Sequence, residues 1–362
     1  MVPIRQGMNI LREEGLFPFC VRGYLYAGLP LWNTITSKYP IGTNIFDKEW
    51  ALLIILDTCR VDSLGKSSDS RSWLNNINQM RSIGSMSAEW ILNTFTEDYR
   101  EQISETAFVS GNIWSHRIFN ERFHEHGNHR YDMIRRGWPS WKPVSSEDFA
   151  HYETVSAIAN QDDRVHPENE AIPHILTDRT IAVGLEKEFD RLIVHYTLPY
   201  LTFIADAIDW EPEQTPMTEL MDGPDPIRDL KPYELSYDPA RRGEVSPETV
   251  REAYLQNLRL ALDYVNILVE NVDAGKAIIS ADHGEALGEH GLWDHPYGYP
   301  FAPVKIVPWV KLSASDERTY DPCYDQLKRE PTEHERTSFS NRWDIFRRVR
   351  DEGHFRIGHY PV

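Results

Sequence analysis

The sequence predicts an α/β fold in which a doubly wound, mostly parallel sheet is flanked by helices. Four short apolar runs, at residues 51–56, 106–110, 191–195 and 276–281, are typical of strands that are buried on both faces. Helical patterns lie between these runs, and the clearest extends from Ser246 to about Val272. Strands that alternate with helices are usually joined by crossovers and form a parallel sheet.

Each element has a local justification. The first run, ALLIIL at residues 51–56, has no polar interruption, and the runs TAFVS, RLIVH and KAIISA repeat this pattern. The long helix has a capping serine at Ser246 and a proline at its first position, Pro247. Its apolar residues recur at helical spacing: Leu255, Leu258, Ala261, Leu262, Val265 and Leu268. Shorter helices are expected over residues 4–14 and 339–350.

Composition excludes several classes of protein. The 362 residues carry a formal net charge of −18, which repels the phosphates of nucleic acids, so we expect no nucleic-acid partner. Hydrophobic residues make up 41% of the chain, enough for a packed core. The three cysteines, Cys20, Cys59 and Cys323, match no zinc-binding spacing and are too few for a disulfide scaffold.

The sequence shows no secretory signal near its start and no run of 18 apolar residues. These observations predict a soluble, cytoplasmic protein, and peripheral contact with the inner membrane surface is left open. Its oligomeric state is not predicted.

Polar residues follow the predicted strands at the point where each strand ends. Asp57 follows the first run, Asn112 lies just after the second, His195 ends the third, and Asp282 and His283 follow the fourth. Because ligands bind at the carboxyl ends of the strands in open α/β sheets, we expect these side chains to form one site.

The segment Asp282-His283-Gly284-Glu285 suits a divalent metal ion. Carboxylate and imidazole ligands together accept zinc, manganese, magnesium or calcium, and Asp57 supplies a second carboxylate from another strand. The glycine permits close approach of the backbone. The alternative is a local turn in which the aspartate and histidine only bond each other.

Two segments resemble a known family. Residues 54–65 read IILDTCRVDSLG and resemble the first metal-ligand motif of the sulfatase-like branch of the alkaline phosphatase superfamily. Residues 280–296 read SADHGEALGEHGLWDHP and resemble the downstream metal-ligand motif of that branch. The resemblance implies an alkaline phosphatase-like α/β fold, with Asp57, Asp282 and His283 as metal ligands.

The extent of the resemblance suggests three regions. Residues 49–312 are predicted to form the catalytic domain, residues 1–48 an aromatic-rich N-terminal arm, and residues 313–362 a charged C-terminal extension packed on the domain. The arm either packs on the domain or contacts a membrane or partner. After Val310 the chain turns charged, and we expect loops there. Residues 210–242, rich in proline and acidic residues, are expected to form a surface excursion, which is either part of a substrate rim or simply solvated.

The family places a nucleophile downstream of the first motif, near the start of a helix. Ser85-Met86-Ser87-Ala88 occupies that position, and Ser87 is the predicted nucleophile, with its helix beginning near Ala88. Coordination to a metal would lower the pKa of the hydroxyl, and a helix N-terminus favours an anionic phosphoryl group. The alternative is that Ser85 or Ser87 only caps the helix.

The pattern departs from that of true sulfatases. Their cysteine or serine is followed by Pro or Ala two positions later and by Arg two further on, and it is converted to formylglycine. Ser87 is followed by Glu89 and Ile91 at those positions, and Cys59 lacks the pattern too, so we expect no formylglycine. A phosphoryl-serine can be released by water without an aldehyde, which favours phosphate esters.

Three further residues are candidates for contact with substrate. His295 stands where many relatives carry a lysine that grips the substrate, and it could bind substrate oxygens or donate a proton as a catalytic residue. Its alternative role is to bond a nearby carbonyl. Tyr200 replaces a histidine of the family, and His195 is expected to support the groups that touch substrate. Arg60 and Asp62 are predicted to form an ion pair that supports Asp57.

Together these residues predict a metal-dependent hydrolase or phosphotransferase that acts on phosphate mono- or diesters through Ser87. The substrate would be a small-molecule, glycan-linked or lipid-linked ester. Two alternatives remain open: a sulfatase that acts on sulfated glycans, and a non-catalytic member of the fold that binds metal, which the replacement at Tyr200 favours.

Overall fold

The computed structural model describes residues 35–36, 39–67, 71, 74, 76–122, 141–155, 173–186, 188–200, 237–241 and 243–322. The helices expected over residues 4–14 and 339–350 lie outside the described residues, as does most of the predicted surface excursion. The boundaries of the three predicted regions therefore stay predictions.

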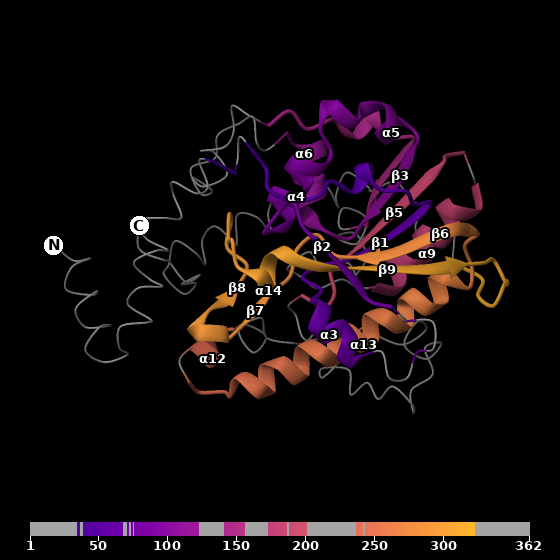
Figure 1. The fold of residues 1–362 in the computed structure, drawn as a ribbon. Helices are drawn as coiled ribbons and strands as arrows, with labels where there is room; N and C mark the ends of the chain where they lie inside the picture. The colour runs from indigo at the N-terminus through magenta and orange to yellow at the C-terminus, as the bar shows by residue number, and fades with distance from the viewer. Residues whose placement is uncertain are drawn as a thin grey trace, which may run out of the picture.

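A seven-stranded sheet forms the centre of the described part, in the order β2-β9-β6-β1-β5-β3-β4 (Figure 1). Five neighbouring strands run parallel: β1 (Leu52–Leu56), β3 (Thr106–Ser110), β4 (His151–Thr154), β5 (Arg191–Tyr196) and β6 (Ala274–Ser280). This arrangement confirms the predicted fold class. It also confirms the four predicted strands to within about two residues at each end.

Two antiparallel strands complete one edge of the sheet. Strand β9 (Ile306–Ala314) pairs with β6, and β2 (Asn78–Arg81) pairs with β9. The expectation of loops after Val310 is wrong at this point, because β9 continues to Ala314. Lys311 is exposed whereas Val310 is buried, so the charged residue lies on the outer face of a strand rather than in a loop.

Helices cover both faces of the sheet (Figure 1). On one side lie α4 (Ser87–Thr94), α5 (Arg100–Ser104) and α6 (Ile113–Phe119); on the other lie α3 (Val61–Lys66), α9 (Pro173–Glu186) and α13 (Pro247–Val269). The capping role of Ser246 is confirmed, since its hydroxyl accepts a hydrogen bond from the backbone of Thr249 at 3.2 Å. This cap and Pro247 fix where the long helix begins.

The remaining elements are short. Strands β7 (Ala286–Leu287) and β8 (Trp293–Asp294) form a separate hairpin, which α14 (Ala302–Lys305) follows in the sequence. The short helix α12 (Asp238–Arg241) precedes α13. Single turns of 3₁₀ helix are η1 (Ile45–Asp47), η2 (Glu97–Tyr99), η6 (Ser146–Asp148) and η8 (Glu289–Gly291).

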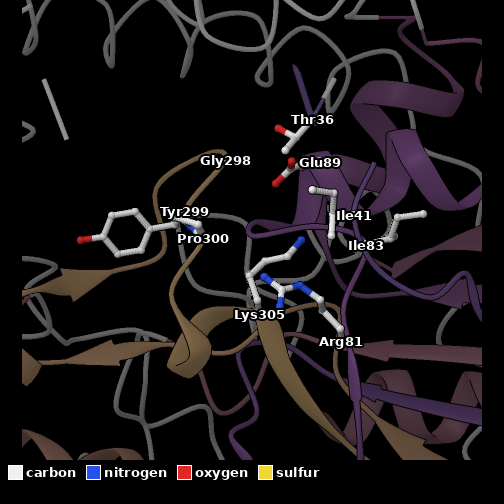
Figure 2. Close-up of a pocket in the computed structure, with 9 residues that line it drawn as sticks. All are labelled: Thr36, Ile41, Arg81, Ile83, Glu89, Gly298, Tyr299, Pro300 and Lys305. Carbon is white, nitrogen blue, oxygen red and sulfur yellow. The ribbon is translucent and has the colours of Figure 1, made fainter. Parts of the chain in front are cut away.

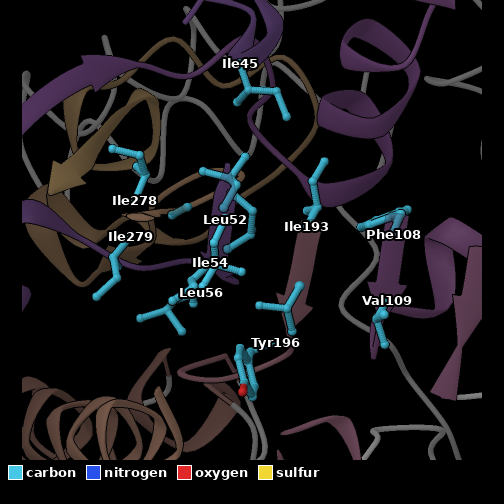
Figure 3. Close-up of a cluster of buried hydrophobic side chains, with 14 of the residues drawn as sticks. Ile45, Leu52, Ile54, Leu56, Phe108, Val109, Ile193, Tyr196, Ile278 and Ile279 are labelled. Carbon is cyan, nitrogen blue, oxygen red and sulfur yellow. The ribbon is translucent and has the colours of Figure 1, made fainter. Parts of the chain in front are cut away.

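The core lies along the central strands. Side chains of β1, β3, β5 and β6 pack there with Ile45 of η1, and all five residues of β1 are fully buried (Figure 3). Burial on both faces accounts for the uninterrupted apolar run in the sequence. The packed core therefore fixes the strand ends that carry the polar residues of the site.

No helix among the described residues is both long enough and apolar enough to span a membrane.

Candidate active site and metal centre

The parallel strands deliver polar side chains to one edge of the sheet. Asp57 directly follows β1, Asn112 follows β3, His195 is part of β5, and Asp282 and His283 follow β6. Because these strands run parallel, their carboxyl ends point the same way. Residues that are far apart in the sequence therefore meet in one small region.

Ser87 lies at the centre of this region. Its hydroxyl oxygen is 3.2 Å from Oδ2 of Asp57 and 3.3 Å from Nε2 of His283. Ser87 is the first residue of α4 and its side chain makes no capping bond; the capping position belongs to Met86. The alternative in which Ser87 only caps the helix is therefore wrong. The hydroxyl faces the predicted metal ligands instead.

Asp57 and Asp282 share one feature: in each carboxylate one oxygen accepts hydrogen bonds and the other does not. Oδ2 of Asp57 accepts a hydrogen bond from Nδ2 of Asn112 at 2.8 Å. Oδ1 of Asp282 accepts from the backbone amides of His283 at 2.8 Å and Thr58 at 3.3 Å. The other oxygens, Oδ1 of Asp57 and Oδ2 of Asp282, are buried and make no hydrogen bond with any residue that the structure describes. Buried carboxylate oxygens of this kind need a cation or a proton.

His283 directs a third acceptor atom at these two oxygens. Its Nδ1 is 2.9 Å from the carbonyl oxygen of Gly284, which fixes the proton on Nδ1 and leaves a lone pair on Nε2. Nε2 lies 3.4 Å from Oδ2 of Asp282 and 3.5 Å from Oδ1 of Asp57. Burial lowers the pKa of His283 to about 3, so the ring is neutral near pH 7. Two carboxylate oxygens and the lone pair of one imidazole nitrogen therefore converge, an arrangement that fits a divalent cation.

Burial and the negative charge of Asp282 both raise the pKa of Asp57 well above its usual range. Two buried carboxylates this close repel each other unless positive charge lies between them. The raised pKa of Asp57 and the two carboxylate oxygens without hydrogen bonds therefore both indicate a place for a positive charge.

Hydrogen bonds to neighbouring segments fix the backbone of the loop that carries Asp282 and His283. The backbone amide of Gly284 donates to the carbonyl of Val304 at 2.7 Å, and the hydroxyl of Ser82 donates to the carbonyl of Asp282. A Cβ atom at position 284 would lie 2.1 Å from the carbonyl oxygen of Pro303. Only glycine fits there, which confirms the prediction that this glycine permits close backbone approach.

His195 offers a further ligand to the same centre. Its Nε2 is 3.4 Å from Oδ2 of Asp282, and neither ring nitrogen makes a hydrogen bond within the described part of the chain. Ligand atoms of Asp57, His195 and Asp282 lie within 4.8 Å of one another. Since the ring is fully buried, this position favours a role through Asp282 or a bound cation over direct contact with substrate.

His295 lies beside His283, with the two ring centroids 4.2 Å apart. Its Nδ1 is 3.0 Å from Oε2 of Glu285, which is fully buried and also accepts a hydrogen bond from the hydroxyl of Tyr237 at 3.1 Å. Burial alone would lower the pKa of His295, but the carboxylates of Glu285 and Asp294 raise it to about 10. His295 therefore carries a positive charge next to a neutral histidine.

The remaining predicted residues lie around this pair. The ring of Tyr200 packs edge-on against His295 with centroids 5.0 Å apart. The predicted ion pair is confirmed: Nε and Nη2 of Arg60 bind the two carboxylate oxygens of Asp62 at 2.8 and 2.9 Å. Arg60 also binds Glu289 at 2.7 Å and the carbonyl of Glu285 at 2.9 Å, so it joins both family-like segments.

Sequence reasoning gave no role to three residues of the site. Asn112 stands out only as a polar residue at a strand end, Glu285 only as part of a motif, and Tyr237 lies in the acidic stretch predicted to be a surface excursion. A signal for Glu285 is present, since this carboxylate lies in the same family-resembling segment, residues 280–296, as His295. No sequence signal pointed to Tyr237.

Comparisons with known proteins give only weak likenesses. No family model matches the chain, and no curated protein does. One similar solved structure is the soluble domain of lipooligosaccharide phosphoethanolamine transferase A from Neisseria meningitidis, at 15% identity and a TM-score of 0.44, covering 74% of this chain and 77% of that one.

Two further structures are similar at 12% identity. The integral membrane form of the same transferase has a TM-score of 0.46, with 88% of this chain and 60% of that chain covered. The C-terminal periplasmic domain of a phosphoethanolamine transferase from Campylobacter jejuni has a TM-score of 0.40, with coverages of 74% and 80%. At these scores the likeness says nothing of this chain's activity.

Proposed function

We propose that this chain is a divalent-metal-dependent phosphoester hydrolase or phosphotransferase that uses Ser87 as its nucleophile. The observation that carries the proposal is the position of the Ser87 hydroxyl, 3.2 Å from Asp57 and 3.3 Å from His283, beside buried carboxylate oxygens that lack hydrogen bonds. A hydroxyl held against a set of cation ligands is the arrangement that activates a serine for attack.

The first step forms a covalent intermediate. Ser87 Oγ attacks the phosphorus atom of the ester, a bond from Oγ to phosphorus forms, and the bond from phosphorus to the leaving alkoxide breaks. Oδ2 of Asp57, the hydrogen-bond acceptor of Ser87, is placed to receive the hydroxyl proton. In the second step the oxygen of water, or of an acceptor alcohol, bonds to phosphorus, and the bond from phosphorus to Ser87 Oγ breaks. Ser87 takes back the proton held by Asp57, and the proton of the attacking hydroxyl passes to His295, the group that protonated the leaving alkoxide.

His295 is the group we assign to the leaving oxygen. Glu285 holds its Nδ1, so Nε2 is left to donate a proton to the departing alkoxide. With a pKa raised to about 10 by Glu285 and Asp294, the ring is protonated near pH 7. The neighbouring His283, with a pKa of about 3, stays neutral. Neighbouring groups with pKa values pushed apart in this way can divide acid and ligand roles between them.

Asp57, Asp282 and His283 are the residues we assign to the cation, with His195 as a further ligand or a support for Asp282. When bound, a divalent cation lowers the pKa of the serine hydroxyl and neutralises charge on the phosphoryl oxygens. The donor set of carboxylate oxygens and imidazole nitrogens admits zinc, manganese, magnesium or calcium.

Phosphate esters fit this site better than sulfate esters do. The residues after Ser87 lack the pattern that directs formation of formylglycine, and a sulfate ester of an unmodified serine has no elimination route for its release. Small-molecule, glycan-linked and lipid-linked phosphate esters all remain within the proposal. The second candidate, a member that binds metal without catalysis, is favoured by Tyr200, because a tyrosine supplies no cationic contact to substrate.

The proposal is tested with the purified full chain and a panel of esters that contains an aryl phosphate, an aryl phosphodiester, a phosphoethanolamine lipid and an aryl sulfate. We expect phosphate or phosphodiester cleavage to exceed sulfate cleavage, and Ser87→Ala to abolish it. Faster cleavage of the sulfate, with an aldehyde at position 87 by mass spectrometry, would establish a sulfatase. Bound metal without turnover of any ester would establish the non-catalytic alternative.

A further inference from the structure

A small hollow lies apart from the catalytic groups, between α4 and the loop before α14 (Figure 2). Its walls come from segments that are distant in the sequence: Thr36 and Ile41, Arg81 and Ile83, Glu89 of α4, residues 298–300, and Lys305. None of the residues assigned to the cation or to phosphoryl transfer lines it. The hollow is therefore a second candidate site.

Two cationic side chains enter this hollow. The ammonium group of Lys305 is buried, with 7% of the residue exposed, and within the described part of the chain it donates one hydrogen bond, to the carbonyl oxygen of Gly84 at 3.0 Å. The guanidinium of Arg81 makes no hydrogen bond or ion pair with any residue in the described ranges. Figure 2 shows both side chains pointing toward the same space, which Glu89 reaches from α4.

Glu89 does not neutralise both cations. Its Oε2 accepts hydrogen bonds from the backbone amide of Ser85 at 2.6 Å and from the hydroxyl of Ser85 at 2.7 Å. It forms no ion pair within 4.0 Å with Lys305 or Arg81 among the described residues. One carboxylate facing two cations leaves a net positive charge in a chain whose formal charge is −18. A buried, partly unsatisfied ammonium group is costly unless an anion accompanies it.

We propose that the mouth of this hollow, whose interior has room for about one water molecule, binds a phosphate group, held by the planar fork of the exposed Arg81 and the ammonium of Lys305. Guanidinium forks bind two oxygens of a tetrahedral oxyanion at once, and a lysine adds a point charge to a third. The N–H groups of Arg81 and Lys305 that make no hydrogen bond within the described residues can bind phosphate oxygens without breaking a contact that the structure shows. The group could come from free inorganic phosphate or from the headgroup of a phospholipid, and the chemistry of recognition is the same.

The hollow is connected to the catalytic loop. The hydroxyl of Ser85, which bonds Glu89, accepts a hydrogen bond from the backbone of Tyr299 at 3.0 Å and lies 3.1 Å from the carbonyl of Pro296. Pro296 directly follows His295. The proposed site does not depend on the function proposed for Ser87, although it abuts the loop that carries His295.

Calorimetric titration of the full chain with inorganic phosphate, and separately with a dispersed short-chain phosphatidic acid, tests the proposal. We expect binding of at least one of the two that weakens by about tenfold or more in Arg81→Gln and in Lys305→Gln. Binding of phosphate alone would identify a free anion as the source, and binding of the lipid alone a headgroup. Matched controls are Arg318→Gln and Lys311→Gln, which change exposed cations elsewhere and should bind like the unaltered chain.

The active site could also bind phosphate, so two further variants separate the sites. Asp57→Asn and Ser87→Ala alter only the catalytic centre, and the proposal predicts that binding to the hollow survives in both. Phosphate binding that is lost in Asp57→Asn but unchanged in Arg81→Gln would contradict the proposal, as would no binding of either probe. A thermal-melting measurement checks that Lys305→Gln is folded; if it is not, the surface variant Arg81→Gln decides the outcome.

Discussion

The hydroxyl oxygen of Ser87 lies 3.3 Å from Nε2 of His283, although 196 positions separate the two residues in the sequence. Strand β6 places His283, and the start of α4 places Ser87, so the contact depends on the packing of the helix layer against the sheet. A serine and an imidazole nitrogen in this position, with two buried carboxylates beside them, form the centre of the site.

Replacement of the proposed nucleophile is expected to stop the reaction. Ser87→Ala should lower kcat on an aryl phosphate by about 10³-fold or more, because no other described hydroxyl lies against both Asp57 and His283. Steady-state kinetics measures the loss. Ser85→Ala is the matched control: Ser85 bonds Glu89 rather than the metal ligands, so a much smaller effect is expected. Equal losses in the two variants would contradict the assignment of Ser87.

Asn112 is expected to orient Asp57 for the cation. Its Nδ2 donates to Oδ2 of Asp57 at 2.8 Å, while its Oδ1 caps α6 by accepting from the backbone of Trp114 at 2.9 Å. Asn112→Ser keeps a capping oxygen and adds no charge but removes the amide donor, so metal affinity should fall by about 10–100-fold without loss of the fold. Metal titration and circular dichroism measure the two effects. Unchanged affinity would mean that Asp57 does not hold the cation.

Removal of metal is expected to lower thermal stability. The unpaired oxygens of Asp57 and Asp282 repel each other without positive charge, and a cation present at about 100 times its Kd should add about 2.7 kcal/mol to the free energy of unfolding. Melting curves with a chelator and with added zinc or manganese measure the shift. In Asp57→Asn the rise in melting temperature on adding metal should be strongly reduced. A rise of the same size in this variant would mean that the cation binds at another place.

Arg60 is expected to stabilise the loop that carries the ligands. It binds Asp62 through two bonds and also reaches Glu289 and the carbonyl of Glu285. Arg60→Lys keeps the charge but cannot form the fork, so the free energy of unfolding should fall by about 1–3 kcal/mol. Denaturant unfolding measures this loss. Arg318→Lys, at an exposed position, is the control and should change little.

Phosphate binding to the hollow is expected to weaken as pH rises. Burial lowers the pKa of Lys305 to about 8, and its charged neighbours from other elements are Glu89 and Arg81. Below this pKa the ammonium is charged and binds the anion; above it the lysine is neutral, and the contact loses its charge. A bound anion favours the charged form, so affinity should fall between about pH 8 and pH 10. Calorimetry at the two pH values measures the change, and an equal fall in Lys305→Gln would exclude this lysine as its cause.

The strands could be predicted because their signal is local. A run such as residues 51–56 is apolar on both faces, and β1 is buried along its whole length. The same reasoning placed no strand over residues 306–314, where β9 lies. Beyond Val310 that strand is exposed on one face, and its Lys311 reads as part of a charged segment. Strand β2 is mostly exposed and polar, so no apolar run marks it.

The site was predictable where residue type and strand end coincide. Asp57, Asp282 and His283 follow buried strands, and that rule alone places them at one edge. The position of Ser87 came from resemblance to a family, since nothing local distinguishes it from Ser85. The bond from Tyr237 to Glu285 and the burial of His195 depend on how distant segments pack, and no pattern in the sequence encodes either contact.

The measurement that tests the account most directly is a search for phosphate bound covalently to Ser87. The full chain is mixed with an aryl phosphate or phosphodiester in the presence of divalent metal, quenched in acid within the first turnover, and digested for mass spectrometry. We expect a phosphoryl group on the peptide that contains Ser87, and none in Ser87→Ala. Turnover that proceeds with no modified serine, or with the phosphoryl group on another residue, would contradict it.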